Sequence, residues 1–341
     1  MSIAMLLFAF PAAGQALDSF EPFPGRMLET VPGTYMENGV GAPSVVWDAN
    51  SNRFLMAFEM RLPETDPACP VGRWGIGMAT SPDGINWTPR PTPVLEPGGD
   101  TFYSCVAAHP SAIFDTARNT VHVFFKSEQM TDACDRGTPA WGCNRYTGVG
   151  RVTVRFNADG DATGAPIPSP QPVLANHIDM GFPEFVSSGG INYLFYTQEG
   201  SVRMATADLL KNFVAEPEPV LEPGFADWAL DTLNNPTVTC DAGGIVMYPG
   251  GRTLDDSGLL SIAGWGRATS TDGLDWTIDP EAYFEWSDDN SWRHWEVNSM
   301  GAYDHVVYHS DKDPVTGAPF ITMMSTTPVI DGSMLSTRIC P

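Results

Sequence analysis

The sequence predicts an all-β protein built from one repeated unit of short antiparallel strands, and three repeated elements carry this prediction. The phrase Gly-Ile-Gly-Met-Ala-Thr-Ser-Pro-Asp-Gly-Ile-Asn-Trp at 75–87 returns at 264–276 as Gly-Trp-Gly-Arg-Ala-Thr-Ser-Thr-Asp-Gly-Leu-Asp-Trp. A proline precedes a short β-branched or aromatic run in several places, and Pro-Val-Leu-Glu-Pro-Gly occurs at 93–98 and again at 219–224. Repetition in this detail indicates a repeated supersecondary unit.

The first strand of each unit is predicted at a proline that is followed by residues with high strand propensity. This pattern occurs four times, at Pro43, Pro110, Pro183 and Pro236. The second strand is predicted where apolar and aromatic residues alternate or cluster between Gly, Asp or Asn. These runs cover 53–60, 121–126, 191–197 and 244–248.

The remaining strands complete a unit of about four. The third strand ends in the Ser-x-Asp-Gly turn, and a Trp-containing strand and the Pro-Val-Leu strand follow it. Antiparallel sheets of about four strands that repeat around an axis are the blades of a β-propeller, in which ring closure hides most strand edges. The sequence therefore predicts a β-propeller.

A fifth unit is predicted after the second copy of the long phrase, at 295–304, 305–310 and 320–326. It lacks a clear Pro-Val-Leu strand, whereas the N-terminus offers one at 26–29. We therefore expect a five-bladed β-propeller of four-stranded antiparallel blades, in which the N-terminal strand completes the last blade. Residues 17–341 would form this single domain.

The composition limits the compartment and the partners. A short apolar run at 4–13 precedes Gly-Gln-Ala at 14–16, which predicts a secretory signal peptide over 1–16 and a secreted or periplasmic protein. The net charge is −23 and the chain has three lysines, Lys126, Lys211 and Lys312. Nucleic acids and anionic membranes bind basic patches, so this composition argues against both as partners. We expect a monomer.

The six cysteines are an even number, as expected for an oxidising compartment. Cys134 and Cys143 share one polar loop and are the easiest pair to propose. Cys240 with Cys340 could tie the C-terminus to an inner strand, and Cys69 with Cys105 would then remain. Sequence alone does not choose among the 15 connectivities.

The pattern from Pro-Ser-Val-Val at 43–46 through the phrase at 75–87 to Pro-Val-Leu at 93–95 resembles the five-bladed propeller glycosidases. This superfamily includes glycoside hydrolase families 43, 32, 68 and 130, and the resemblance covers nearly the whole mature chain. It implies a glycoside hydrolase that acts on a polysaccharide or oligosaccharide, with plant or algal glycans as a reasonable class. It implies no cofactor, although an axial calcium ion is possible in the superfamily.

The repeated residues are predicted to build the scaffold, since repetition in two units suits a scaffold better than a single active site. Asp83 and Asp272 can accept backbone hydrogen bonds in a turn, and the glycine after each can adopt positive φ. Trp87 and Trp276 can fill the space between blades. The same structural role is predicted for the aspartates that end two first-strand runs, Asp48 and Asp115.

Function is expected where the units differ, at the entrances of the innermost strands, which converge on the axial funnel. These entrances are rich in carboxylate, imidazole and aromatic side chains, which suit a sugar site. We expect Asp179, Asp231 and Glu296 to supply the catalytic carboxylates, one as the acid and another as the base or nucleophile. The predicted substrate-binding residues are Glu37, Tyr103, His109, His177, Trp228, Arg293, His294 and Trp295.

The family resemblance does not place the catalytic acids directly. Relatives in family 32 have an Asp directly before the prolines of the first and second inner strands. They have a Glu two residues before the proline of the third. Here the corresponding residues are Ala42, His109 and Gly181. Asp179, Asp231 and Glu296 are therefore predicted as displaced acids, whereas Glu184 is expected to pack or to form an inter-blade hydrogen bond.

Two other functions follow from the missing acids. One is a non-catalytic carbohydrate-binding propeller that uses the same aromatic-lined funnel. The other is a polysaccharide lyase in which His109 or His177 acts with Tyr103 as base and acid.

Overall fold

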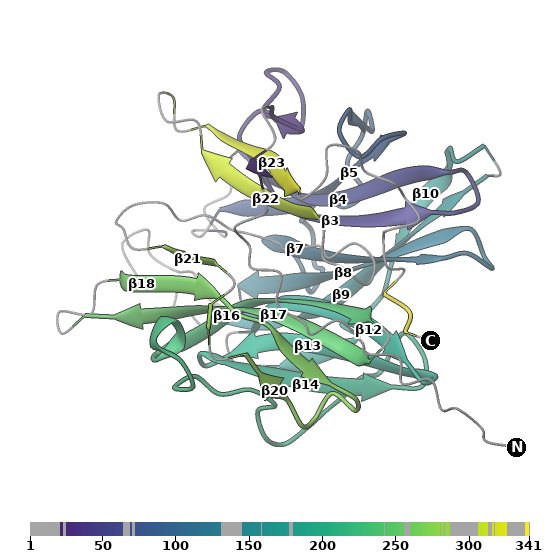
Figure 1. Cartoon of the computed structure of the whole chain (residues 1–341). Helices are drawn as coiled ribbons and strands as arrows, with labels where there is room; N and C mark the ends of the chain where they lie inside the picture. Colours follow the sequence, from purple (N-terminus) through teal and green to yellow (C-terminus); the bar gives the residue numbers. More distant parts are fainter. Residues whose placement is uncertain are drawn as a thin grey trace, which may run out of the picture.

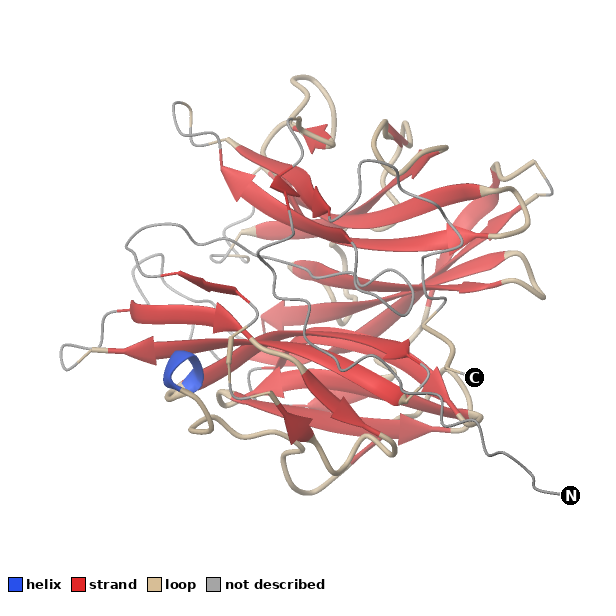
Figure 2. Ribbon diagram, in the orientation of Figure 1, coloured by secondary structure: helices blue, strands red, loops and turns tan. Residues whose placement is uncertain are grey.

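The structure is a computed structural model of the whole chain, and its description below covers the following residues: 21–22, 25–63, 69, 72–130, 145–157, 159–176, 180–241, 243–255, 260–279, 281–282, 284–286, 306–312, 316, 318–325 and 338–340. Strands make up nearly all the regular structure of these residues (Figure 2). Their only helical segment is a short 3-10 turn, η3 (Asp227–Ala229). The all-β prediction is confirmed. Within these ranges no helix is long and apolar enough to cross a membrane.

The first half of the chain forms two antiparallel groups of strands. The first group is β3 (Val40–Asp48), β4 (Arg53–Leu62), β5 (Arg73–Ser81) and β6 (Thr88–Pro89). The second group is β7 (Val106–Asp115), β8 (Thr120–Met130), β9 (Arg145–Phe156), β10 (Ala162–Pro168) and β11 (Leu174–Asn176). A single parallel pair, Trp74 with Val106, joins the two groups into one sheet.

Two further antiparallel groups follow in the second half. The third group is β12 (Met180–Ser188), β13 (Ile191–Gln198), β14 (Ser201–Ala207) and β15 (Val214–Ala215). The fourth group is β16 (Thr232–Asp241), β17 (Gly244–Leu254), β18 (Leu260–Trp265), β19 (Ala268–Ser270), β20 (Thr277–Ile278) and β21 (Phe284–Trp286). β18 and β19 both pair with β17, so together they occupy the place of a third strand.

The last group joins the two ends of the chain. It contains β22 (Val306–Lys312), β23 (Pro319–Ser325), β1 (Glu21–Pro22) and β2 (Leu28–Glu29). Both N-terminal strands pair with β23, as expected for an N-terminal strand that completes the last sheet. In Figure 1 the yellow β22 and β23 lie beside the purple β3 and β4, and β22 contacts β3. Phe54, Phe58, Tyr308 and Ile321 belong to one apolar core between the first and last groups.

The first strands of the first four groups, β3, β7, β12 and β16, share one irregularity, and we call them the lead strands. In β7 the pairing with β8 runs to Ala108 and resumes at Ser111, so His109 and Pro110 form a bulge opposite one residue. The bulge suits proline because proline has no N–H to donate to the ladder. The register shifts at the same place in the other three strands.

The residue before each of these prolines has a positive φ, and we call the four the pre-proline residues. Their φ angles are +41° at Ala42, +48° at His109, +49° at Phe182 and +41° at Asn235. Positive φ is costly for a residue with a Cβ, and a following proline favours extended backbone instead. Strain of this kind persists where the surrounding structure enforces it, and it gathers at functional sites.

In three of the four lead strands, the residue after the proline bonds to the next lead strand. Ser44 Oγ accepts a hydrogen bond from the N–H of Ala112 at 2.9 Å, and Ser111 Oγ accepts one from the N–H of Phe185 at 3.0 Å. Glu184 accepts the corresponding bond from the N–H of Val238. The expectation that Glu184 forms a hydrogen bond between sheets is confirmed.

The two copies of the Asp-Gly turn have the predicted structural role. Asp83 Oδ1 accepts the N–H groups of Ile85 at 2.9 Å and Asn86 at 2.8 Å, and Trp87 Nε1 donates to the carbonyl oxygen of Gly84 at 3.0 Å. The second turn repeats these bonds with Asp272 as the acceptor and Leu274, Asp275 and Trp276 as the donors. Trp87 packs edge to face on Tyr308, and Trp276 packs in the same way on Phe195.

Candidate active site

Two pre-proline residues from neighbouring groups meet face to face. The imidazole of His109 on β7 stacks on the ring of Phe182 on β12, with centroids 4.1 Å apart and planes inclined by 15°. The bulges explain this contact, because each turns the pre-proline residue out of the regular alternation of its strand. The two positions that break the strand pattern therefore form one contact.

Glu59 on β4 lies directly beside His109. Its carboxylate oxygen Oε2 accepts the backbone N–H of His109 at 3.3 Å and lies 3.7 Å from the Nε2 of the same residue. The Glu59 side chain is 6% exposed. Burial raises the pKa of Glu59 to about 7, although the His109 N–H and the charge of Lys126 act to lower it. The carboxyl group therefore exchanges its proton near neutral pH.

A charged pair on β8 completes this cluster. Lys126 Nζ lies 2.7 Å from Glu128 Oε1, and both side chains are largely buried. Lys126 pairs with Ala108, one residue before the bulge of β7, and Glu59 pairs with Gly41, one residue before the bulge of β3. The acid and the base therefore occupy equivalent positions in neighbouring groups, and the positive charge lies near the titrating carboxyl group.

The fourth group has polar side chains at the bulge of its lead strand. Asn235 is the pre-proline residue of β16, and its buried Oδ1 has no hydrogen-bond partner among the described residues. In the orientation that satisfies its amide, the Asn234 oxygen accepts hydrogen bonds from Arg252 Nε at 3.0 Å and Nη2 at 3.2 Å. An unsatisfied buried oxygen such as Asn235 Oδ1 can accept a donor from a ligand.

Of the predicted catalytic carboxylates, only Asp231 lies within the described residues. It is exposed, it directly precedes β16, and its Oδ2 accepts the N–H of Leu254 at 2.7 Å. Asp179 and Glu296 lie outside the described residues. Among the predicted binding residues, the same is true of His177, Arg293, His294 and Trp295.

Three predicted binding residues besides His109 have described positions. Glu37 is exposed, and its Oε2 accepts the N–H of Gly33 at 3.1 Å within a local turn. Tyr103 and Trp228 are buried, at 8% and 2% exposure. Tyr103 packs edge to face on Phe102 and Phe125, whereas Trp228 lies against Gly251 and Gly266. The structure therefore brings His109, and none of these three, into the Glu59 cluster.

Sequence reasoning missed the carboxyl group that contacts His109. Glu59 stands in an apolar second-strand run, between Phe58 and Met60, and all three residues are buried. A charged residue in such a run is costly to bury unless it has partners, so its presence there is a signal of function. Lys126 and Glu128 give the same signal on β8.

Disulfides join Cys69 to Cys105 and Cys240 to Cys340, as two of the predicted pairs required. Cys134 and Cys143 lie outside the described residues.

In the part of the chain that the structure describes, no group of three or more His, Cys, Asp or Glu side chains could hold a metal ion.

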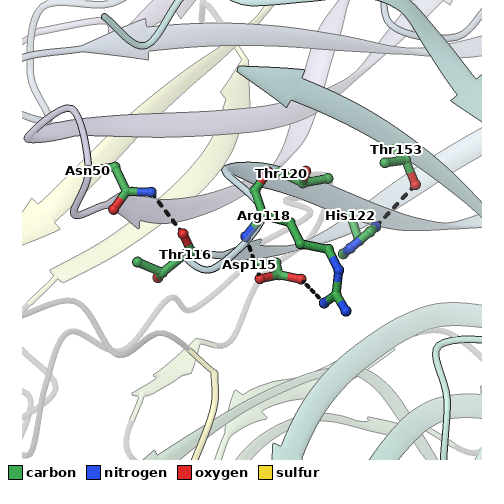
Figure 3. Close-up of polar contacts among 7 residues, drawn as sticks. All are labelled: Asn50, Asp115, Thr116, Arg118, Thr120, His122 and Thr153. Carbon is green, nitrogen blue, oxygen red and sulfur yellow. Dashed lines mark hydrogen bonds and ion pairs between the residues drawn. The ribbon is translucent and has the colours of Figure 1, made fainter. Parts of the chain in front are cut away.

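A second polar cluster lies at the opposite end of β7 (Figure 3). Asp115 accepts the N–H of Arg118 at 3.1 Å and its Nη1 at 2.7 Å, which closes the β7–β8 turn. His122 Nδ1 lies 3.1 Å from Thr153 Oγ1 on the neighbouring strand. These contacts stabilise the turn and the strand pair. Asp115 therefore has the structural role that the sequence predicts, and so does Asp48, which accepts the N–H groups of Asn50 and Ser51.

Comparison with known proteins identifies the fold. No family model and no curated protein matches this chain. Solved structures do match: a glycosyl hydrolase from Bacteroides ovatus is 12% identical, with a TM-score of 0.60 over 93% of this chain and 96% of the other. A structure from work on the GH130 family of mannoside phosphorylases, which contains glycoside hydrolases that target β-1,2 mannosidic linkages in Candida mannan, is 14% identical with a TM-score of 0.60. It covers 94% of this chain and 95% of its own.

A third structure belongs to Zg3597, a family 117 glycoside hydrolase produced by the marine bacterium Zobellia galactanivorans. It is 14% identical, with a TM-score of 0.55 over 90% of this chain and 89% of the other. Identities this low show a shared fold and leave the chemistry to the site itself. The structural neighbours of this chain are thus glycoside hydrolases, as the sequence resemblance predicted, and the chain has their fold.

Proposed function

We propose that this protein is a secreted glycoside hydrolase whose reaction centre lies at the Glu59–His109 contact. The observation that carries the proposal is a buried carboxyl group with a pKa of about 7 that is bonded to a strained pre-proline residue. A carboxyl group of this kind can donate a proton at neutral pH, which is the task of the general acid in glycoside hydrolysis.

The proposal includes a closed ring of five blades. Contacts run in order from β22 to β3, from β3 to β7, from β7 to β12 and from β12 to β16. By these contacts the last group lies beside the first and the other groups follow in sequence order, which is the order that a closed ring requires. In such a ring the pre-proline residues of successive blades face one axial funnel.

In the proposed reaction, Glu59 donates its proton to the leaving oxygen as the glycosidic bond breaks. The N–H of His109 holds the carboxylate that remains, and the charge of Lys126 stabilises it. The aromatic face formed by His109 and Phe182 offers an apolar surface for a sugar ring.

A second carboxylate must activate water or attack the anomeric carbon. Asp179, Asp231 and Glu296 are the proposed candidates, since each lies at the entrance of a predicted innermost strand. The substrate class that the sequence resemblance favours is a plant or algal polysaccharide. A single catalytic domain in an oxidising compartment fits the disulfides Cys69–Cys105 and Cys240–Cys340.

The first test replaces Glu59 by Gln and measures reducing ends released from arabinan, xylan, mannan and agar-type polysaccharides. We expect the rate on the best substrate to fall by about 10²–10⁴-fold, the usual contribution of a general acid. Glu218→Gln is the matched control, because this carboxylate is exposed and is not among the predicted site residues. Equal rates for Glu59→Gln and the wild type would refute the role of Glu59.

A second measurement distinguishes an acid from a residue needed for folding. An aryl glycoside whose leaving group needs no proton should be cleaved by Glu59→Gln at a rate much closer to the wild-type rate. Asp179→Asn, Asp231→Asn and Glu296→Gln, made singly, then identify the second carboxylate by a loss on both kinds of substrate.

Two results would assign a different function. Binding of a polysaccharide without turnover by the wild type would identify a carbohydrate-binding propeller. An unsaturated product whose formation depends on His109 and survives Glu59→Gln would identify a lyase.

A further inference from the structure

The C-terminal residues 338–340 attach to two lead strands. Ile339 pairs in parallel with Ser187 at the end of β12. The N–H of Ser187 donates to the carbonyl oxygen of Arg338 at 2.9 Å, and the N–H of Cys340 donates to the carbonyl oxygen of Ser187 at 2.6 Å. The disulfide with Cys240 ties the same segment to β16. The segment therefore joins β12 to β16 through both backbone and covalent bonds.

The side chain of Arg338 also connects β7 to β12. Its Nη1 donates to both Ser111 Oγ and Glu184 Oε2. The Arg338 and Glu184 side chains are each 4% exposed, so this is a buried ion pair. Arg338 itself has a φ of +53°, which is unfavourable for a residue with a Cβ. The buried guanidinium is thus held by a residue whose backbone is strained.

The place of this ion pair in the two strands connects it to the candidate site. Ser111 directly follows Pro110, and Glu184 directly follows Pro183. Each lies two residues from the pre-proline residue of its strand, His109 or Phe182, and these two residues form the aromatic stack. A shift of β7 relative to β12 at Ser111 and Glu184 would therefore separate the stacked rings.

We infer that Arg338 is a positioning residue: its guanidinium fixes the bulges of β7 and β12 relative to each other, so that His109 stacks on Phe182 and presents its N–H to Glu59. The catalytic consequence of this inference rests on the proposed function, whereas the structural consequence does not. Ser111 and Glu184 belong to separate sheets, and no ladder hydrogen bond joins β7 to β12 among the described residues. Ser111 Oγ already accepts the N–H of Phe185 and lies 3.3 Å from Glu184 Oε2, and the arginine adds a charged bond to both Ser111 and Glu184.

Charge explains why an arginine serves this purpose. Burial raises the pKa of Glu184, and the Arg338 guanidinium opposes that shift. Without the guanidinium, the buried carboxylate must take up a proton or admit water, and either response changes the spacing of the two strands. A neutral side chain at 338 therefore removes the arginine bridge and the charge that favours the ionised form of Glu184, and leaves only the bonds of Ser111 between the two strands.

The test uses the ring protons of His109, which lie over Phe182 and should resonate upfield because of its ring current. The signals are assigned by comparison with His109→Gln. We expect Arg338→Gln to move them downfield, toward their positions in Phe182→Leu, while circular dichroism shows a folded all-β protein. Arg118→Gln is the matched control, since this exposed arginine pairs with Asp115 at the other end of β7. It should leave the His109 signals unchanged.

Unchanged His109 signals in a folded Arg338→Gln protein would overturn the inference, even if its melting temperature fell. If Arg338→Gln does not fold, the double variant Glu184→Leu/Arg338→Met gives the same test. It removes both members of the ion pair and so leaves no buried charge unpaired, and the His109 signals should still move downfield. Unchanged signals in that folded protein would again contradict a positioning role.

Activity measurements separate this inference from the proposed function. If the wild type hydrolyses a glycan, Arg338→Gln should lower kcat/KM about tenfold or more, because both the acid and the stacked rings that face the sugar are misplaced. If the wild type hydrolyses none, the proposed function fails. The His109 signals then still decide whether Arg338 positions the stacked rings.

Discussion

The hydroxyl of Tyr308 on β22 donates a hydrogen bond of 2.9 Å to the carbonyl oxygen of Gly84, in the Asp-Gly turn of the first group. The two residues are 224 positions apart in the chain. Trp87 of the same turn packs edge to face on the Tyr308 ring. A turn that repeats within the sequence thus fastens the last group of strands to the first.

Replacing Tyr308 by Phe should lower the free energy of unfolding by about 0.5–1.5 kcal/mol, the usual net contribution of one hydrogen bond. The cost stays moderate because the Gly84 carbonyl oxygen still accepts Trp87 Nε1. Urea unfolding measures the change. Tyr103→Phe is the control, since no described residue hydrogen-bonds the Tyr103 hydroxyl, and its effect should be smaller. An equal effect for both variants would contradict the role of the bond.

Glu59→Gln should change how stability depends on pH. The pKa of Glu59 is about 7 in the folded protein, against 4.5 for an ordinary glutamate. Because the folded state holds this proton more tightly than the unfolded chain does, Glu59 contributes to the free energy of unfolding below pH 4.5. This contribution is lost as the pH rises through 7.

The glutamine variant has no such loss. Its stability relative to the wild type should therefore rise between about pH 4.5 and 7, by on the order of 3 kcal/mol. Chemical unfolding at several pH values checks this, with Glu37→Gln as the control. A constant difference between the two proteins across this range would show that Glu59 titrates normally.

His122→Gln should protect the fold against acid. Burial and the nearby charges of Arg151 and Arg118 lower the pKa of His122 from 6.5 to about 4. The unfolded chain therefore binds a proton first as the pH falls below 6.5, and the folded state loses stability until about pH 4.

Glutamine keeps a polar group near Thr153 and removes this proton. Its unfolding free energy should fall less between pH 6.5 and 4, by about 2 kcal/mol after allowance for partial exposure. Thermal unfolding in buffers across this range tests the effect. Parallel pH profiles for the variant and the wild type would count against it.

Gly150→Ala should destabilise the second group of strands. A Cβ at this position would overlap the ring of Phe125 and lie 2.8 Å from Phe102, and Phe125 is fully buried. Overpacking of a dense core costs about 1–3 kcal/mol.

The double variant with Phe125→Leu shows whether the overlap is the cause. The two changes together should cost less than the sum of their separate effects, because the smaller side chain leaves room for the new methyl group. Urea unfolding of all four proteins gives the coupling. Strict additivity would mean that Gly150 matters for its backbone freedom instead.

The repeated elements of the fold could be predicted from sequence because each depends on local chemistry. The Asp-Gly turns satisfy their own backbone N–H groups, and the N-terminal strand pairs with β23 as expected. The prediction that strands start at the prolines was less accurate. Each lead strand begins earlier and carries its proline inside a bulge, as β7 does from Val106 onward.

The candidate site was harder to predict because its contacts cross between groups of strands that are far apart in the sequence. His109 was identified as the anomalous residue, but its partners Glu59 and Phe182 come from β4 and β12. Register differences of one residue decide which side chains meet there, and the bulges change the register. Nothing in a single chain sequence reports that a residue before proline will adopt positive φ, since the local preference is the opposite.

The residues on either side of the lead-strand prolines are under different constraints, which bears on how such a protein can acquire new chemistry. The position after the proline holds Ser, Ser, Glu and Thr, and in the first three it accepts a backbone hydrogen bond from the next lead strand. The position before it holds Ala, His, Phe and Asn, which share no chemical property. One neighbour of the proline maintains the assembly, and the other is open to variation. A new reactive group could enter at the second position without disturbing the bonds made by the first.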